Sequence, residues 1–302
     1  MNARTHDFRC ELDFEVRPDG THTAHVERWF LGALTLFPTA MEQVLSGSGL
    51  DPAGIRGGVC GEPGSMWGFF RAEVPGARGV RSFARVITAK NQDWIVDSIR
   101  KGALVVEAGF SLLDRYGMPG ERLCRITAER LEDTDWFSLS LQVSSETFLS
   151  DQDAYLDFVR SVAEVCDPSF GAISYAYSLG KTALESRLGP PWRPPQESVP
   201  ASRSYLRGYD WLTICASELG EKLGGLSALR AGGAFHSAER LGAGGFWLLA
   251  TPRHEEYDED AARKVWRSLA PCLRPGVPKR MASLGEPPLP VIYEDAREAL
   301  GS

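Results

Sequence analysis

The spacing of apolar residues near the N-terminus predicts a strand followed by a helix. Apolar and polar residues alternate from Cys10 to Val16, which is the period of a strand with one buried face. Pro18-Asp19-Gly20 predicts the turn that follows. Pro38 ends or kinks the next helix, because proline lacks the N–H that a helix interior needs. The apolar stripe of this helix is formed by Val26, Trp29, Phe30, Ala33, Leu34 and Phe37.

The pattern is weaker in the segment that follows. Residues 46–64 are rich in glycine and proline and predict a loop. Residues 66–73 and 80–88 predict two strands, and residues 93–99 a short helix. Residues 103–113 form a short apolar run, which fits either a strand or a buried helix because so short a run does not reveal its period.

From Asp135 the pattern sharpens into a strand, a helix and a second strand. Residues 137–143 alternate apolar with polar and predict a strand with one buried face. Asp151 is the predicted N-cap of the helix. Residues 170–177 predict the second strand, which would pair in parallel with the first through a right-handed crossover if both lie in one sheet. The helix stripe consists of Tyr155, Phe158, Val159, Val162 and Cys166.

The C-terminal third predicts a connecting loop, then alternating strands and helices. Gly189–Pro200 contains five prolines and predicts a rigid loop without regular structure. A strand is expected at 209–215, a helix capped by Ser217, and a hairpin over 235–251 with a glycine-rich turn. Asp258 is the predicted cap of a last helix. Its inner stripe is Ala262, Val265, Trp266 and Leu269.

These elements together predict an α+β fold. We expect a mixed or antiparallel sheet with helices packed mainly on one face, built from two interlocked strand-helix-strand halves. We expect residues 1–302 to form one compact unit, with halves 1–130 and 131–302 and a proline-rich connecting loop at 189–200. With 43% hydrophobic and 24% charged residues, the composition is that of a globular protein with a core.

Charge and cysteine usage narrow the expected partners and compartment. The net charge is −7 with no basic run, so we expect neither nucleic acid nor a membrane surface as partner, whereas the charge permits a basic protein partner. The N-terminal residues lack the apolar core of a signal peptide, and no apolar run reaches the about 20 residues of a membrane span. Six cysteines without a C-x-x-C pair predict reduced, buried thiols in a cytoplasmic protein.

Several residue combinations are candidates for chemical sites. His22 and His25 could form half a metal site, but no third ligand is evident, so solvated histidines and no metal are expected. Cys215 precedes a helix start, where a thiol pKa can fall, and His236 or His254 would be its base. A buried structural cysteine is the favoured alternative. No cofactor is expected, because neither residues 56–64 nor the glycines near 242 match a nucleotide-binding loop.

The densest acidic run lies just before and at the start of the last predicted helix. Its carboxylates suit either a solvated helix N-terminus or a contact surface for a basic partner. Trp211 belongs either to the core or, if exposed, to an interface as an anchor. The candidate binding residues are therefore Glu255, Glu256, Asp258, Glu259, Asp260 and Trp211.

Three segments resemble a bacterial family of type VI secretion immunity-like proteins. They are the strand-helix-strand stretch from Asp135-Trp136-Phe137 to Tyr175, the stretch from Arg207-Gly208-Tyr209-Asp210-Trp211 to Gly225, and Gly244-Gly245-Phe246-Trp247 with the last helix. The resemblance covers most of the chain, apart from residues 46–130, and it brings no catalytic residues. It implies a protein that binds and neutralises a cognate toxin, and we therefore expect a non-enzymatic role. Two alternatives remain: a small-molecule enzyme using Cys215 or another pocket, and a structural component of a secretion or gene-cluster system.

Overall fold

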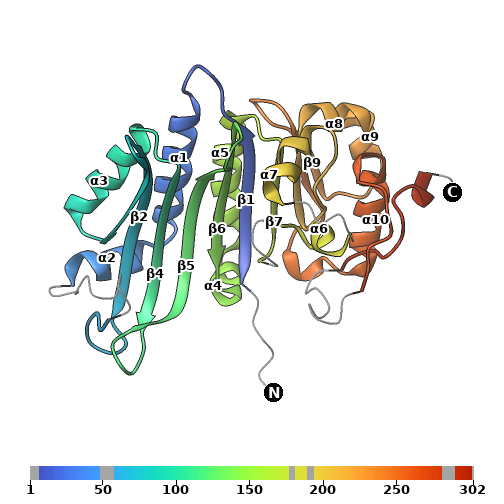
Figure 1. Cartoon of the computed structure of the whole chain (residues 1–302). Coiled ribbons are helices and arrows are strands. Elements are labelled where there is room, and N and C mark those ends of the chain that lie inside the picture. The colour runs from blue at the N-terminus through green and yellow to red at the C-terminus, as the bar shows by residue number, and fades with distance from the viewer. Residues whose placement is uncertain (1–6, 48–57, 177–180, 189–193, 281–289, 301–302) are drawn as a thin grey trace. The chain divides into compact units, whose positions relative to one another are not determined.

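The computed structural model describes residues 7–47, 58–176, 181–188, 194–280 and 290–300 (Figure 1). The fold is α+β, as predicted, and its strands pair in antiparallel fashion. The chain divides into two compact units. Unit 1 comprises residues 1–15, 131–136 and 159–302, and unit 2 comprises residues 16–130 and 137–158.

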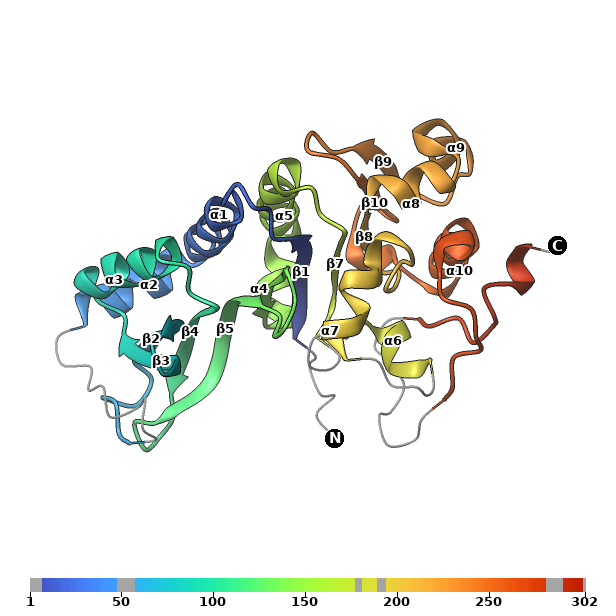
Figure 2. The same cartoon turned by 45° about the horizontal axis from the view of Figure 1, so that its top comes forward.

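Unit 2 is a sheet with helices on one face. Its strands follow the order β3-β2-β4-β5-β6. In Figure 2 helices α1, α2 and α3 lie together on one side of strands β2, β4 and β5. Aromatic pairs join the two layers, with Phe30 6.1 Å from Phe70 and Phe37 6.1 Å from Phe110 between ring centroids. The elements are α1 (His22–Thr35), α2 (Pro38–Ser46), β2 (Met66–Gly76), β3 (Gly79–Val86), α3 (Ala89–Arg100), β4 (Val105–Leu113), β5 (Pro119–Arg130), β6 (Trp136–Val143) and α4 (Ser145–Ser150).

Helix α5 (Gln152–Cys166) runs from unit 2 into unit 1. Asp151 caps it, since its carboxylate accepts a hydrogen bond from the Ala154 N–H at 3.2 Å, as predicted. Phe158 and Val162 of the predicted stripe are buried, and the Phe158 ring lies 4.7 Å from that of Trp29. The sequence therefore identified both the start and the buried face of this helix correctly.

Unit 1 has a sheet in the order β1-β7-β8-β10-β9 and several short helices. Its strands are β1 (Phe8–Glu15), β7 (Phe170–Tyr175), β8 (Leu212–Cys215), β9 (Ser237–Arg240) and β10 (Phe246–Leu249). Its α-helices are α6 (Ala183–Arg187), α7 (Pro195–Ser198), α8 (Ser217–Lys222), α9 (Gly225–Ala231) and α10 (Glu259–Leu269). Single 3-10 turns lie at η2 (Pro200–Arg203), η3 (His254–Glu256), η4 (Ala270–Cys272) and η6 (Glu298–Leu300).

Several local predictions need correction. The ambiguous run 103–113 is strand β4, and β5 was not predicted at all. The proline-rich segment contains helix α7, which starts with Pro195 at a position where its missing N–H costs nothing; residues 189–193 lie outside the described part. Ser217 is the first residue of α8 rather than its cap, which is Ala216. Within the predicted loop 46–64, residues 48–57 lie outside the described part.

The predicted strand-helix-strand pair also needs correction. Strand β6 pairs with β5, and β7 pairs with β1 and β8, in each case antiparallel. Because β7 takes β1 and β8 as its neighbours, it cannot be the parallel neighbour of β6 that the sequence predicted. The hairpin of β9 and β10 is confirmed, and its Gly244 and Gly245 have φ of 119° and 86°, which side chains disfavour.

Candidate functional site

The five predicted acidic residues lie on one short stretch of unit 1, residues 254–260, which we call the acidic turn. Glu255, Glu256, Asp258, Glu259 and Asp260 are all exposed. His254 and Tyr257 alternate with them and are buried, with 7% and 5% of their surfaces exposed. The turn is thus fixed to the protein by two side chains and presents its carboxylates to solvent.

His254 anchors the turn through aromatic contacts. Its ring meets Phe8, Tyr175 and Trp211 edge-on, at centroid distances of 4.6, 5.3 and 5.8 Å. Burial lowers the pKa of His254 to about 4, so the imidazole is neutral near pH 7. A neutral ring is the form that this aromatic surrounding tolerates.

Trp211 is fully buried, and its indole N–H donates to the Thr251 carbonyl oxygen at 3.0 Å. A side chain without exposed surface offers a partner nothing to contact. Trp211 therefore belongs to the core beneath the acidic turn, and we remove it from the predicted contact surface. Its contact with His254 makes it a support of that surface.

Helix α10 holds the other end of the acidic turn. Asp258 caps the helix by accepting from the Ala261 N–H at 2.9 Å, as predicted. Arg263 lies 3.6 Å from Glu259 and 2.5 Å from Glu294, so it offsets part of the local negative charge. The inner stripe of the helix is buried, as the sequence predicted: Ala262, Val265, Trp266 and Leu269.

A buried ionic cluster, which the sequence did not reveal, lies elsewhere in unit 1. The Arg207 guanidinium, 2% exposed, bonds the Asp13 carboxylate at 2.5 Å and the Glu185 carboxylate at 2.9 Å. On β1, Arg9 pairs with Glu11 at 2.9 Å and donates to the Lys181 carbonyl oxygen at 2.6 Å. Arg9, Glu11 and Asp13 alternate with apolar residues, so they looked like the solvent-facing side of a strand.

Burial disfavours the charged form of two carboxyl groups in this region. Burial raises the pKa of Asp210 well above its usual value, and the nearby Glu11 raises it further. Burial likewise raises the pKa of Glu11. The Glu11 Oε1 atom has no hydrogen-bond partner among the described residues. Because the cluster's charged groups are nearly all enclosed and engaged with one another, its evident role is to join β1 to the segments around Glu185 and Arg207.

Cys215 is fully buried on β8. Burial raises its pKa far above the usual thiol value, and the neighbouring Cys272 adds to the effect. A nucleophilic cysteine needs the opposite, a lowered pKa and access to substrate. Within the described part of the chain, no hydrogen bond joins the Cys215 sulfur to His236 or His254.

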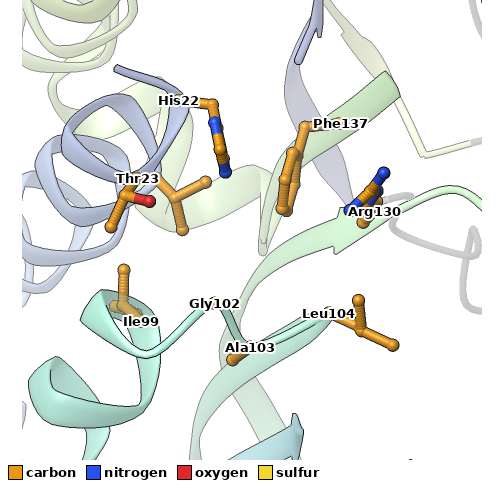
Figure 3. A pocket seen from close by; sticks show the side chains of 9 residues that line it. His22, Thr23, Ile99, Gly102, Ala103, Leu104, Arg130 and Phe137 are labelled. Atoms are coloured by element: carbon orange, nitrogen blue, oxygen red, sulfur yellow. The ribbon is translucent and has the colours of Figure 1, made fainter. Parts of the chain in front are cut away.

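A small pocket in unit 2 is lined by His22 of α1 and Phe137 of β6, whose side chains face each other in Figure 3. The two rings stack at 5.8 Å. The pocket holds about 50 Å³, enough for one or two waters and far below the about 300 Å³ of an ordinary ligand site. The described residues contain no group of three side chains that could hold a metal ion.

Comparisons with known proteins identify the fold. Neither the family models nor the curated proteins searched contain a match to the chain. Among solved structures, the chain is similar to the Pseudomonas aeruginosa T6SS protein PA0821, with a TM-score of 0.52 and 14% sequence identity. The alignment covers 97% of this chain and 80% of that protein. In the described part, no helix is both long and apolar enough to cross a bilayer.

Proposed function

We propose that this chain is an immunity-like protein that binds and neutralises a bacterial toxin of the type VI secretion system (T6SS). Two independent observations support the proposal. Three segments of the sequence resemble immunity-like proteins, and the fold is similar to that of a protein named for the T6SS, across nearly the whole chain. A shared fold is compatible with many functions, so the contact surface has to carry the specific argument.

The acidic turn is the surface that supports toxin binding most directly. It combines five exposed acidic residues with two buried side chains, His254 and Tyr257, that anchor the turn to the protein. A rigid surface loses little conformational freedom on contact, which favours binding. Its negative charge steers a basic surface toward it and raises the association rate, with a dependence on salt. This arrangement suits a basic face of the toxin.

The proposed role is non-enzymatic, and the alternative is a small-molecule enzyme that uses Cys215. The complete burial and raised pKa of this thiol oppose nucleophilic chemistry. A structural component of a secretion system is a third option, and the fold similarity alone does not separate it from an immunity protein. Only binding to a toxin distinguishes these functions.

The test uses a candidate toxin, namely the product of the gene next to the one that encodes this protein. Its association with the protein is measured at two ionic strengths. The variant reverses Glu255, Glu256 and Glu259 to lysine. We expect its association rate to fall about tenfold at low salt, while the wild-type rate falls as salt rises. An unchanged rate would remove the acidic turn from the interface, and no binding by the wild type would reject the toxin assignment for that pair.

A matched variant controls for net charge. Glu42, Glu121 and Glu132 are also exposed, and they lie away from the acidic turn in sequence. Reversing these three to lysine changes the total charge by the same amount. We expect this control to keep most of the wild-type association rate, because steering depends on where the charge lies as well as on its sum.

A further inference from the structure

Strand β3 is at one end of the strand order, so one of its edges has no neighbouring strand. The Ile87 N–H donates to the Gly68 carbonyl oxygen at 3.0 Å, which sets the phase of the antiparallel ladder with β2. Residues 79, 81, 83 and 85 therefore direct their backbone groups toward β2. The N–H and C=O groups of Val80, Ser82 and Ala84 point to the free edge, and within the described ranges they have no hydrogen-bond partner.

The protein covers comparable edge groups elsewhere. At the C-terminal end of β3, the Asn91 amide donates to the Val86 carbonyl oxygen at 2.8 Å. On β9, the last strand in the order of unit 1, Arg230 Nε donates to the Ala238 carbonyl oxygen at 2.9 Å. Natural proteins protect free edges in this way because such edges recruit other strands. Between Val80 and Ala84, no described residue covers the outward backbone groups in this way.

The side chains of this edge add apolar surface and positive charge. Val80 is 56% exposed and Phe83 43% exposed, on opposite faces of the strand. Arg81 and Arg85 flank Phe83 on the face that carries the helices, where the Arg85 guanidinium lies 4.3 Å from the ring centre of Trp94 of α3. The segment 66–90 holds five basic residues and one acidic residue in a chain of net charge −7. The edge is therefore basic and partly apolar, opposite in sign to the acidic turn.

We infer that the β3 edge binds an extended, acidic segment of a partner protein, which adds to the sheet as a further strand. Backbone groups of the segment would pair with Val80, Ser82 and Ala84. Carboxylates on one face would meet Arg81 and Arg85, with an apolar side chain between them against Phe83. This inference goes beyond the proposed toxin binding, because it concerns another surface and a partner of opposite charge. A second copy of the chain is disfavoured as the occupant, because two basic hairpins would repel.

A synthetic peptide provides the probe. The peptide carries glutamate, valine and glutamate at every second position, with threonine between them, so that these three side chains share one face of the added strand. A control peptide has lysine in place of glutamate. We measure amide hydrogen exchange of the full-length protein by NMR with each peptide. The glutamate peptide should slow exchange at Val80, Ser82 and Ala84 by about tenfold or more, as expected for newly bonded amides, and the lysine peptide should not. Slowing at other amides, or no slowing, would overturn the inference.

Two variants localise the effect. Ala84→Pro removes one outward N–H and leaves the ladder with β2 intact, since proline is tolerated on an edge strand. It should abolish protection by the glutamate peptide. Arg81→Glu should weaken the binding of the glutamate peptide and strengthen the binding of the lysine peptide. This variant keeps the test valid if the proline variant fails to fold. The charge control is Arg122→Glu, at an exposed position of β5. Equal effects of both arginine variants would contradict the assigned site.

Self-association is a separate outcome of the same experiment. If the three amides are already protected without peptide, and light scattering gives twice the monomer mass, the edge is occupied by a second copy. That result would overturn the acidic-segment assignment. A monomer whose amides exchange rapidly until the glutamate peptide is added is the outcome that the inference requires.

Discussion

Replacing Arg207 with methionine should destabilise the protein severely, because it removes the central cation of the buried ionic cluster. Arg207 bonds Asp13 and Glu185 at 2.5 and 2.9 Å, and the Asp13 side chain is fully buried. Burial alone lowers the pKa of Arg207, but the carboxylates of Asp13, Glu185 and Glu11 raise it above its usual value. Methionine fills much of the same space without charge, so the loss is mainly electrostatic.

The magnitude follows from what the substitution leaves behind. At an effective dielectric constant of about 20, opposite charges about 3 Å apart attract by roughly 5 kcal/mol before the cost of desolvation. Removing one partner of a buried pair costs about 3–5 kcal/mol, because the remaining carboxylate stays buried and uncompensated. A whole domain is stable by only about 5–15 kcal/mol. Arg207→Met should therefore remove a large share of the stability.

Urea unfolding at pH 7, followed by tryptophan fluorescence and circular dichroism, measures the effect. Adding Asp13→Asn to Arg207→Met should restore part of the loss, since the second change removes one of the two carboxylates that Arg207 paired. The matched control is Arg240→Met, because Arg240 pairs with Glu221 on the surface at 2.9 Å and both side chains are 56% exposed. It should cost about 1 kcal/mol or less. A loss below about 1 kcal/mol for Arg207→Met would refute the reasoning.

Three further predictions concern titration and packing. The pKa of His254, about 4 in the folded protein, lies below its unfolded value, so its contribution of about 3 kcal/mol to stability is present above pH 6.5 and is lost toward pH 4. In His254→Gln, the free energy of unfolding measured in urea should therefore change less with pH in that window. Asp210 shows the opposite sign, because its folded pKa is raised: Asp210→Asn should stabilise the protein at pH 7, with a gain that shrinks to nothing below pH 4, and a loss at pH 7 would contradict this. Phe158→Ala should cost about 3–5 kcal/mol in thermal or urea melts, whereas Val165→Ala, at a 42% exposed position of the same helix, should cost under about 0.5 kcal/mol.

Local patterns predicted the elements whose signals are carried by neighbouring residues. The stripe of α5 and the Asp258 cap of α10 were correct, because helical spacing and capping depend on residues within one or two turns. Strand β5 was missed although Cys124, Ile126 and Ala128 alternate with polar residues. Two of these three residues, Cys124 and Ala128, have small side chains, so the alternation has little contrast.

The buried ionic cluster could not be predicted from local sequence patterns. Arg9, Glu11 and Asp13 have the alternation of a half-exposed strand, and only distant residues bury them. Their partners include Arg207, 194 positions after Asp13, and the carbonyl group of Lys181, 172 positions after Arg9. The acidic turn was predicted because its charges are contiguous. The position of Trp211 beneath the acidic turn was not predicted, since strand periodicity does not tell which face of a sheet other elements cover.

The stoichiometry of neutralisation tests the central claim most directly. The toxin's activity is titrated with this protein and followed over time, with Cys215→Ala as a second sample. Binding predicts that inhibition saturates at a fixed molar ratio, does not grow with incubation and is unchanged by Cys215→Ala, while the Glu255, Glu256 and Glu259 reversal shifts the titration to higher concentration. Progressive inactivation of excess toxin by a small fraction of the protein, lost in Cys215→Ala, would contradict the account and establish an enzyme instead.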